Sequence, residues 1–546
     1  MEHSAEKGCL LCGQFLALME TEQSEEPLDI GVIYIYRLMN NIENNIEDDP
    51  DEPMPEVGEY RLSLDDSGEY QYLDIFLDQH GGSVDIKRSR KDALPLIKQW
   101  LDTCCSKHKC ADNVPGKPFL PTRLVYTKGS TPRLCLAVDI LGSSKYATLS
   151  HCCKFKDKMR SNIDRFKKEI PSAALTQTFK DAIEVAQALG IDYIWIDSLC
   201  IIQDKDSDDW AVESAQMSDV YGNSYLNIAA TCAPDGRHGL FQVDKEHRNM
   251  SFRAWTSDKS DSYHCVSPNM YKKSMLEAPL MQRAWVVQER LLSSRTVHFT
   301  STQVFWECDD KTLCEAYPSG MTNYIAFKEY GDSRYLKKPL VEYKWDHIVQ
   351  LYTSCSLSFG RDKLPAISGV VDAMKVFKKC EYVAGLWADD TFPLQLCWKV
   401  SSLRSDRLPK PKYRAPSWSW AAVDSPVTYF LTALHYANKP GYKLQPYVEI
   451  CGFGTAAINS GCLEEASGLP LVLKCKYLLP IKPVAADGFE WFHEGLDYLN
   501  QNMENLHFLC IQVVANGDLY TQTDCLILEK TSIKQGLEDM KSFVQS

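Results

Sequence analysis

The sequence has no apolar run approaching the roughly 20 residues that a membrane-spanning helix needs. Its first residues, "MEHSAEKGCLLCGQF", start acidic and lack a basic segment ahead of an apolar one, so we expect no secretory signal. The 21 cysteines are spread along 546 residues, without the density of a disulfide scaffold. These absences favour an intracellular, cytoplasmic protein with reduced thiols and no membrane span.

A stripe of Lys and Arg is also lacking. Residues 1–80 hold 20 Asp/Glu against three Lys/Arg, a balance of −17, while the whole chain carries −14, so the remaining residues sum to about +3. Binding to a phosphate backbone depends on clustered positive charge. Nucleic acid is therefore not an expected partner.

What the sequence does contain is an ordinary globular composition, with 45% hydrophobic and 24% charged residues. The length suggests about three domains of the usual size. We place them at 1–115, 122–310 and 311–546. The first is an α+β region with short β-like runs around an acidic loop and a helix at 94–105. The last is a helical stretch followed by β-rich segments, one of them at 413–423.

The central part alternates between two kinds of element. Short apolar runs predict strands at 146–152, 193–202, 225–231 and 296–308. Amphipathic runs predict helices at 178–190, 206–221 and 283–294. Strands that alternate with helices indicate an α/β fold with a parallel sheet and right-handed crossovers.

The last of these helices, "RAWVVQERLLSSR" (283–295), is mostly apolar but carries Gln288, Glu289 and Arg290 in its middle. One interpretation makes the triplet the solvated face of an amphipathic helix, with Glu289 paired to Arg290 or Arg295. The other makes Glu289 face a functional site. The helix by itself does not decide between the two.

Four stretches resemble a known family: "YATLSHCCKF", "YIWIDSLCIIQDKDSDDWAVESAQMSDVYGNSYLNIAAT", "RAWVVQERLLSSRTVHFTSTQVFWEC" and "RAPSWSWA". Together they are similar to the fungal heterokaryon-incompatibility (HET) domain proteins. One stretch departs from the pattern, because "SHCCKF" stands where the family usually has an aromatic residue and a Gly. The resemblance implies a cell-death effector in allorecognition, with an incompatibility partner protein.

The element order at 146–310 is also similar to a TIR domain, which has a small flavodoxin-like sheet. Some TIR domains cleave NAD at the nicotinamide–ribose bond with one Glu, four residues after a Trp. Trp285 and Glu289 have this spacing, which puts both on one helix face. The resemblance therefore implies NAD as substrate and Glu289 as the catalytic residue.

Residues at the predicted strand ends are expected around the same site, because parallel strands present their carboxyl ends at one edge of the sheet. A carboxylate there can stabilise an oxocarbenium-like state, and an aromatic ring can flank the base or sugar. The expected substrate-binding residues are Ser150, His151, Asp197, Ser198 and Trp285, with Thr231 ending the next strand.

Two other functions stay open at this point. One is that the central domain is a non-enzymatic oligomerising module that recruits death partners. The other is that it is a cysteine hydrolase that uses Cys200 or Cys152 with His151. A cysteine in an apolar strand is more often an inert core residue.

Cysteines near the start of the chain indicate a separate site. Cys9 and Cys12 form a Cys-x2-Cys pair, and the later "CCSKHKC" contributes Cys104, His108 and Cys110. These residue types are zinc ligands, although the spacing of the second group is irregular. The alternative is that Cys9 and Cys12 belong to an apolar helix face.

The TIR resemblance also implies homo-oligomers, in which neighbouring subunits complete the site. We therefore expect activity or toxicity to rise more than linearly with protein concentration. The measurement is activity across a dilution series, with the oligomeric state followed by light scattering. Full activity of a monomer at high dilution would contradict the expectation.

Overall fold

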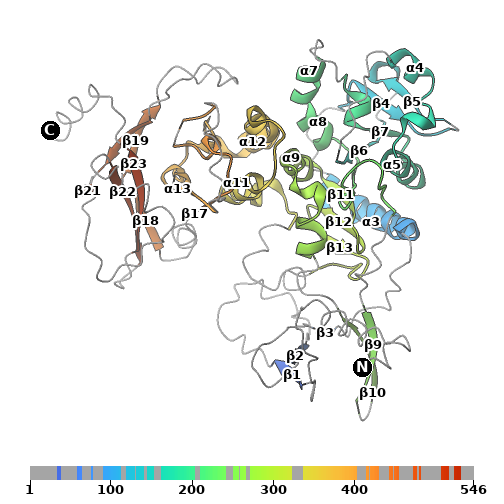
Figure 1. The fold of residues 1–546 in the computed structure, drawn as a ribbon, viewed down its shortest axis with the longest axis horizontal. Coiled ribbons are helices and arrows are strands. Elements are labelled where there is room, and N and C mark those ends of the chain that lie inside the picture. Colours follow the sequence, from blue (N-terminus) through green and yellow to red (C-terminus); the bar gives the residue numbers. More distant parts are fainter. Residues whose placement is uncertain are drawn as a thin grey trace, which may run out of the picture. The chain divides into compact units, whose positions relative to one another are not determined.

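In the computed structural model of the protein, the described residues are 90–111, 119–129, 131–140, 144–152, 162–202, 209–241, 271–321, 336–396, 398–401, 414–416 and 418–429, together with separate strands. The chain divides into two compact units, Met1–Glu342 and Tyr343–Ser546 (Figure 1). The division into three domains stays a prediction.

An eight-stranded sheet forms the centre of the first unit (Figure 1). In chain order its strands are β4 (Arg123–Tyr126), β5 (Arg133–Leu136), β6 (Tyr146–Ser150), β7 (Tyr193–Trp195), β8 (Leu226–Ala229), β11 (Arg295–Phe299), β12 (Val304–Cys308) and β13 (Thr312–Cys314). Across the sheet the order is β13-β12-β11-β8-β6-β7-β4-β5. The predicted α/β class is confirmed.

The sheet is parallel only in its middle. β11, β8, β6 and β7 pair in parallel, and Thr148 of β6 lies opposite both Trp195 and Asn227. The outer strands β12, β13, β4 and β5 pair antiparallel. Short connections cannot make the crossover that parallel neighbours need, so β4–β5 and β11–β12–β13 form hairpins. The predicted parallel sheet is therefore present in the middle, and both of its edges are antiparallel.

The helix predicted at 178–190 is confirmed as α5 (Gln177–Ala188). The Thr176 side chain caps it by accepting from the Phe179 backbone N–H, at 3.3 Å. Gly190 follows the helix with a φ of +74°, a conformation that favours glycine after a helix end.

The strand predicted at 193–202 is wrong in its second half. β7 ends at Trp195, and a single helical turn, α6 (Asp197–Cys200), follows it. The Asp197 carboxylate accepts the Ser198 backbone N–H at 2.5 Å, a local bond that draws the chain out of the strand. Asp197 therefore lies just beyond the sheet edge. The helix predicted at 206–221 is also divided, into α7 (Asp209–Ala215) and α8 (Met217–Gly222).

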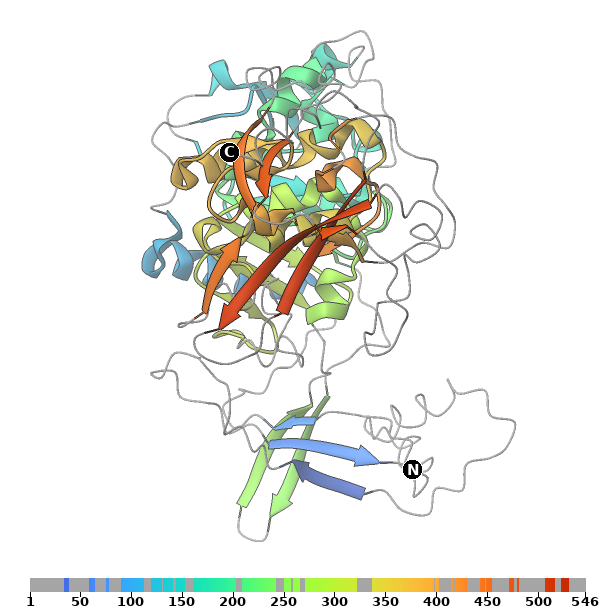
Figure 2. The ribbon, with the colours of Figure 1, turned by 90° about the vertical axis from the view of Figure 1, so that its left-hand side faces the viewer.

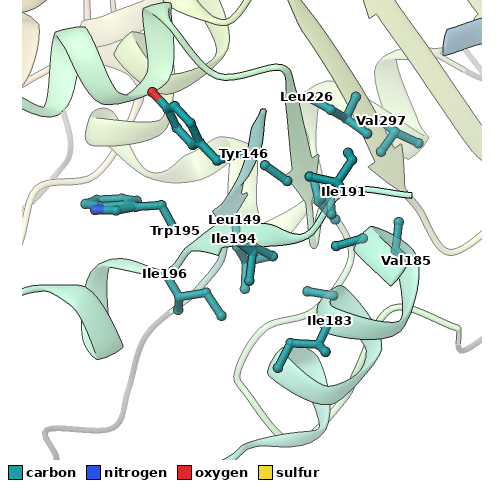
Figure 3. Packing of buried hydrophobic residues seen from close by; sticks show 14 of the residues in the cluster. Tyr146, Leu149, Ile183, Val185, Ile191, Ile194, Trp195, Ile196, Leu226 and Val297 are labelled. Atoms are coloured by element: carbon teal, nitrogen blue, oxygen red, sulfur yellow. The ribbon is translucent and has the colours of Figure 1, made fainter. Parts of the chain in front are cut away.

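One hydrophobic core joins the sheet to its helices. Figure 3 shows Ile183 and Val185 of α5 packed in the same cluster as Leu149 and Ile194 of the strands. α3 (Leu94–Lys107) contributes buried residues to this core, including Trp100, and lies beside β12. The helix predicted for the first domain thus belongs to the core of the sheet.

The first unit also contains two small antiparallel sheets. β1 (Tyr34–Leu38), β2 (Gly58–Ser63) and β3 (Ile75–Leu77) form one of them. β9 (Met250–Thr256) and β10 (Lys259–Cys265) form a hairpin whose β10 lies beside β3 (Figure 2).

The second unit contains the predicted helical stretch as α11 (Trp345–Ser354) and α12 (Pro365–Lys378), followed by α13 (Phe392–Gln395). Three antiparallel strand pairs follow: β14 (Tyr382–Val383) with β15 (Leu386–Trp387), β16 (Trp398–Val400) with β17 (Val427–Tyr429), and β19 (Val448–Phe453) with β20 (Leu471–Cys475). A four-stranded antiparallel sheet consists of β18 (Tyr442–Pro446), β21 (Leu479–Pro480), β22 (Leu506–Ala515) and β23 (Gln522–Glu529). Among the described residues, no helix is long and apolar enough to span a membrane.

The strand predicted at 413–423 is wrong. Its described residues include a 3-10 turn, Trp420–Ala422, which Ser419 starts by accepting the Ala421 N–H at 3.0 Å. Trp420 is fully buried, and its indole N–H donates to the Gly385 carbonyl at 2.7 Å. The aromatic residues that suggested a strand therefore anchor a turn.

A buried charge network fastens α9 (Ala284–Leu292) to the β11–β12 hairpin. Arg290 donates to both carboxylate oxygens of Glu307, each at 2.7 Å. Tyr271 and His298 also contact this carboxylate, at 2.5 and 3.0 Å. Burial alone would raise the pKa of Glu307, but the Arg290 charge and these hydrogen bonds hold it well below its ordinary value. The carboxylate is ionised and the Arg290 charge is compensated.

We expect Arg290→Met to lower the free energy of unfolding by about 3–5 kcal/mol, because it leaves the Glu307 charge buried and uncompensated. Arg290→Met combined with Glu307→Leu should recover a large part of the loss. Urea unfolding of the wild type and both variants gives the comparison. A single variant within about 1 kcal/mol of the wild type would show that the pair does not hold the helix.

Candidate functional site

The site lies at the carboxyl end of the parallel strands. Across the sheet the four parallel strands lie in the order β7-β6-β8-β11. If they are numbered 1 to 4 in chain order, this is the order 2-1-3-4. The order therefore reverses at β6, which has β7 on one side and β8 on the other. Ligands of open α/β sheets bind outside the carboxyl ends of the strands at such a reversal. Ser150 ends β6, and Asp197 follows β7 by two residues.

Glu289 of α9 is buried, with 5% of its surface exposed. Its Oε2 atom has no hydrogen-bond partner within the described part of the chain. Gln288 and Arg290 are buried as well, so the interpretation of the triplet as a solvated face is wrong. A buried carboxylate with an unused oxygen is the feature that a ligand site provides and that a packed core avoids.

Neither cation suggested as a surface partner of Glu289 has that role. Arg290 is bonded to Glu307, as described above. Arg295 donates to Cys104 Sγ and to the Tyr225 carbonyl, both at 3.3 Å. The alternative of an ordinary surface ion pair through these two residues is therefore wrong.

Arg283 is the cation that acts on Glu289. Burial raises the pKa of the Glu289 carboxyl, and the Arg283 charge together with hydrogen bonding from Ser150 and Tyr221 opposes that rise. Arg283 also donates to the His151 carbonyl, which fixes its guanidinium against the end of β6. Its own pKa would fall on burial, but the charges of Glu289 and Asp197 raise it overall.

Ser150 is positioned by the neighbouring strand. Asn227, in β8, has both of its side-chain amide atoms near Ser150 Oγ. Asn227 Nδ2 is 3.1 Å from this oxygen, and Asn227 Oδ1 is 3.2 Å from it. Thr148 donates to the same Asn227 oxygen at 3.0 Å. All three side chains are buried. Their hydrogen bonds hold the Ser150 hydroxyl in one place beside Glu289.

His151 lies next to Ser150 and is also buried. Its Nε2 is 3.5 Å from Asp197 Oδ1, too long for a well-formed hydrogen bond, and its ring meets Phe179 edge-on at 5.1 Å. Burial lowers the pKa of the imidazole more than the Asp197 charge raises it, so the ring is neutral near pH 7. His151 Nε2 and Ser198 Oγ, both buried, have no hydrogen-bond partner among the described residues.

The remaining expected residues make other described contacts. Trp285 is partly buried and packs against the main core. Thr231 is 3.0 Å from His298 Nδ1 and so joins the Glu307 network. Cys200 is fully buried, and burial raises the pKa of its thiol to about 12. An uncharged, buried thiol is a poor nucleophile, which argues against Cys200 as a catalytic residue.

The sequence analysis missed three residues of this group: Tyr221, Asn227 and Arg283. Arg283 directly precedes α9, the helix that contains Glu289. A cation this close in sequence to the candidate carboxylate was a signal that the sequence offered. Tyr221 gave no signal, because an aromatic residue in a helix is an ordinary core pattern. Asn227 did give one, because a polar residue within an apolar strand is unusual in a core.

The structure brings part of the predicted cysteine set together with one further cysteine. Cys104, His108 and Cys110 do come together, and Cys308 of β12 joins them. Cys9 and Cys12 lie outside the described residues. Cys308 lies 200 residues from His108 in the sequence, too far for any spacing motif to include it.

Comparison with known families gives one match. Residues 146–289 match the family model described as Heterokaryon incompatibility protein (HET). The matched region runs from the first residue of β6 to Glu289, so it contains Ser150, His151 and Asp197 as well. No curated protein and no solved structure matches the chain. The match associates this region with heterokaryon incompatibility.

The raised pKa of Glu289 predicts a pH effect on stability. A carboxyl whose pKa is higher in the folded state binds its proton more tightly there, so folding stability falls as pH rises through the interval above 4.5. Glu289→Gln removes this titration. We expect the variant to match the wild type near pH 4 and to be more stable at pH 7, as measured by thermal unfolding at the two pH values. Equal stability at both would show that the carboxylate is not strained by its burial.

Proposed function

We propose that the chain is a cytoplasmic cell-death effector of heterokaryon incompatibility and acts by hydrolysing NAD at the nicotinamide–ribose bond. The observation that carries the proposal is the Glu289 carboxylate, which is buried beside the strand ends with one oxygen unused by the described residues. The family match to residues 146–289 supports the biological role.

The strand order supports the likeness to TIR domains. The order 2-1-3-4 of β6, β7, β8 and β11 begins the 2-1-3-4-5 order of flavodoxin-like sheets. The next strand, β12, is antiparallel, which departs from that pattern. The proposal therefore rests on the parallel half of the sheet and on α9, where Trp285 and Glu289 share a helix face.

In the proposed reaction the bond between nicotinamide N1 and ribose C1′ breaks, and its electron pair leaves with nicotinamide. The ribose then carries oxocarbenium character, which the Glu289 carboxylate stabilises. Water attacks C1′ and loses a proton, giving ADP-ribose, nicotinamide and H⁺. Nicotinamide leaves as a neutral molecule, so the reaction needs no general acid.

The surrounding groups fit this role for Glu289. The carboxyl must be ionised to stabilise the cation. Burial and the Asp197 charge raise its pKa, and Arg283, Ser150 and Tyr221 oppose that rise and favour the ionised form. Ser198 Oγ and neutral His151 Nε2, which have no hydrogen-bond partner in the described part of the chain, are available to ribose hydroxyls. The Arg283 guanidinium supplies positive charge that suits a pyrophosphate.

One observation favours the second candidate, a non-enzymatic module that recruits death partners. Ser150, His151 and Glu289 expose only 1%, 4% and 5% of their surfaces. Polar groups buried to this degree also serve to specify a unique core. In this case the group shapes the domain for assembly, and NAD is not consumed.

We expect Glu289→Gln to abolish NAD loss and cell killing while the domain stays folded. The substitution keeps the volume and removes the charge that stabilises the transition state, which should cost roughly 3 kcal/mol of barrier, on the order of a hundredfold in rate. The assay is release of nicotinamide from NAD by the purified protein, with the melting temperature recorded beside it.

The matched control is Glu277→Gln, the same change at an exposed residue shortly before the helix. It should leave both nicotinamide release and killing unchanged. A wild-type protein that kills but releases no nicotinamide would favour the recruiting module. Unchanged nicotinamide release by Glu289→Gln would remove this residue from the mechanism.

A further inference from the structure

Three cysteines and one histidine converge at one edge of the central sheet. Cys104 lies in the last turns of α3, His108 ends that helix, Cys110 follows in a 3-10 turn, and Cys308 ends β12. Their four ligand atoms all lie within 4.8 Å of one another. All three cysteines are buried, and the His108 side chain is only 11% exposed.

The arrangement matches what a tetrahedral zinc site requires. Zinc–sulfur bonds of about 2.3 Å place tetrahedral sulfur ligands about 3.8 Å apart, so the observed group needs to close by at most about 1 Å. His108 Nδ1 already lies 3.4 Å from Cys308 Sγ. Four protein ligands leave no open position, which is the form of structural rather than catalytic zinc.

Neighbouring groups support the ligands in the manner expected around a metal. The other ring nitrogen of His108, Nε2, lies 3.4 Å from an Asp310 carboxylate oxygen. The Lys311 backbone N–H donates to Cys308 Sγ at 3.4 Å, and Arg295 donates to Cys104 Sγ at 3.3 Å. A carboxylate behind a histidine ligand and donors to the sulfurs orient ligands and offset thiolate charge.

We propose that Cys104, His108, Cys110 and Cys308 bind one structural Zn²⁺ ion. The ion joins the end of α3 to the β12–β13 turn, two segments about 200 residues apart in the sequence. The four ligands complete the coordination, so Cys9 and Cys12 are not needed. Cys105, in the same helix, contacts the Tyr225 hydroxyl at 3.2 Å instead and is not part of the group.

The first test is the metal content of the full chain purified without chelator. We expect about one zinc per chain by elemental analysis. Exchange of zinc for Co²⁺ should give the absorption of a tetrahedral cobalt–thiolate site. A folded protein without metal that also fails to give this spectrum with added Co²⁺ would overturn the proposal, as would a disulfide between two of these cysteines detected by mass spectrometry.

The second test uses matched serine variants. Cys308→Ser and Cys110→Ser should reduce bound zinc to under about a tenth of the wild-type value at limiting free zinc, and should lower the melting temperature. Cys105→Ser and the double variant Cys9→Ser/Cys12→Ser should keep both zinc and melting temperature. Loss of zinc from the double variant with retention in Cys308→Ser would place the metal elsewhere. If a ligand variant does not fold, the cobalt spectrum of the wild type still decides the question.

Discussion

The bond between Arg290 and Glu307 sets the geometry on which the rest of the site depends. Adjacent helical residues point about 100° apart, so fixing Arg290 against β12 also fixes the direction of Glu289. With both charged side chains of the triplet buried, a rotation of α9 would expose the Glu307 charge to an apolar core without its partner. The helix therefore has one orientation, and in that orientation Glu289 lies with Ser150 and Arg283.

The two buried carboxylates of this region are held in opposite ways. Glu307 receives a bidentate bond from Arg290 and a contact from His298, which keep its pKa low, and the Tyr271 hydroxyl donates to it as well. Glu289 has one carboxylate oxygen, Oε2, without a hydrogen-bond partner among the described residues, and burial keeps its pKa raised. A fully bonded carboxylate contributes to folding, whereas a buried carboxylate with an unused oxygen costs stability. That cost is expected where a residue is retained for function rather than for folding.

The outer edge of the sheet presents a different constraint. β13 and β12 form the last hairpin, and α3 lies beside β12 through Trp100, whose ring centroid is 6.5 Å from that of Trp306. The thiol and imidazole group lies at the end of this packed pair. A metal at this point would fix α3 to β12, one of the last strands of the eight-stranded sheet along the chain, and it would do so independently of the chemistry at Glu289.

The sequence by itself determined the α/β class, the helix at 178–190 and the approximate positions of the four parallel strands and of β12, because apolar spacing follows directly from burial on a strand or helix face. It did not predict β4, β5 or β13. It also singled out Ser150, His151 and Asp197, since strand ends of a parallel sheet share one edge. Glu289 was singled out by its place in a polar triplet of an apolar helix and by the resemblance to TIR domains. Only the tertiary structure decided that the triplet at 288–290 is buried, that Arg283 rather than Arg290 acts on Glu289, and that Cys308 joins Cys104, His108 and Cys110. The burial of the triplet and the cysteine group depend on contacts between segments far apart in the chain, about which local spacing carries no information. The choice between Arg283 and Arg290 depends on the direction of each side chain, which packing against the sheet decides.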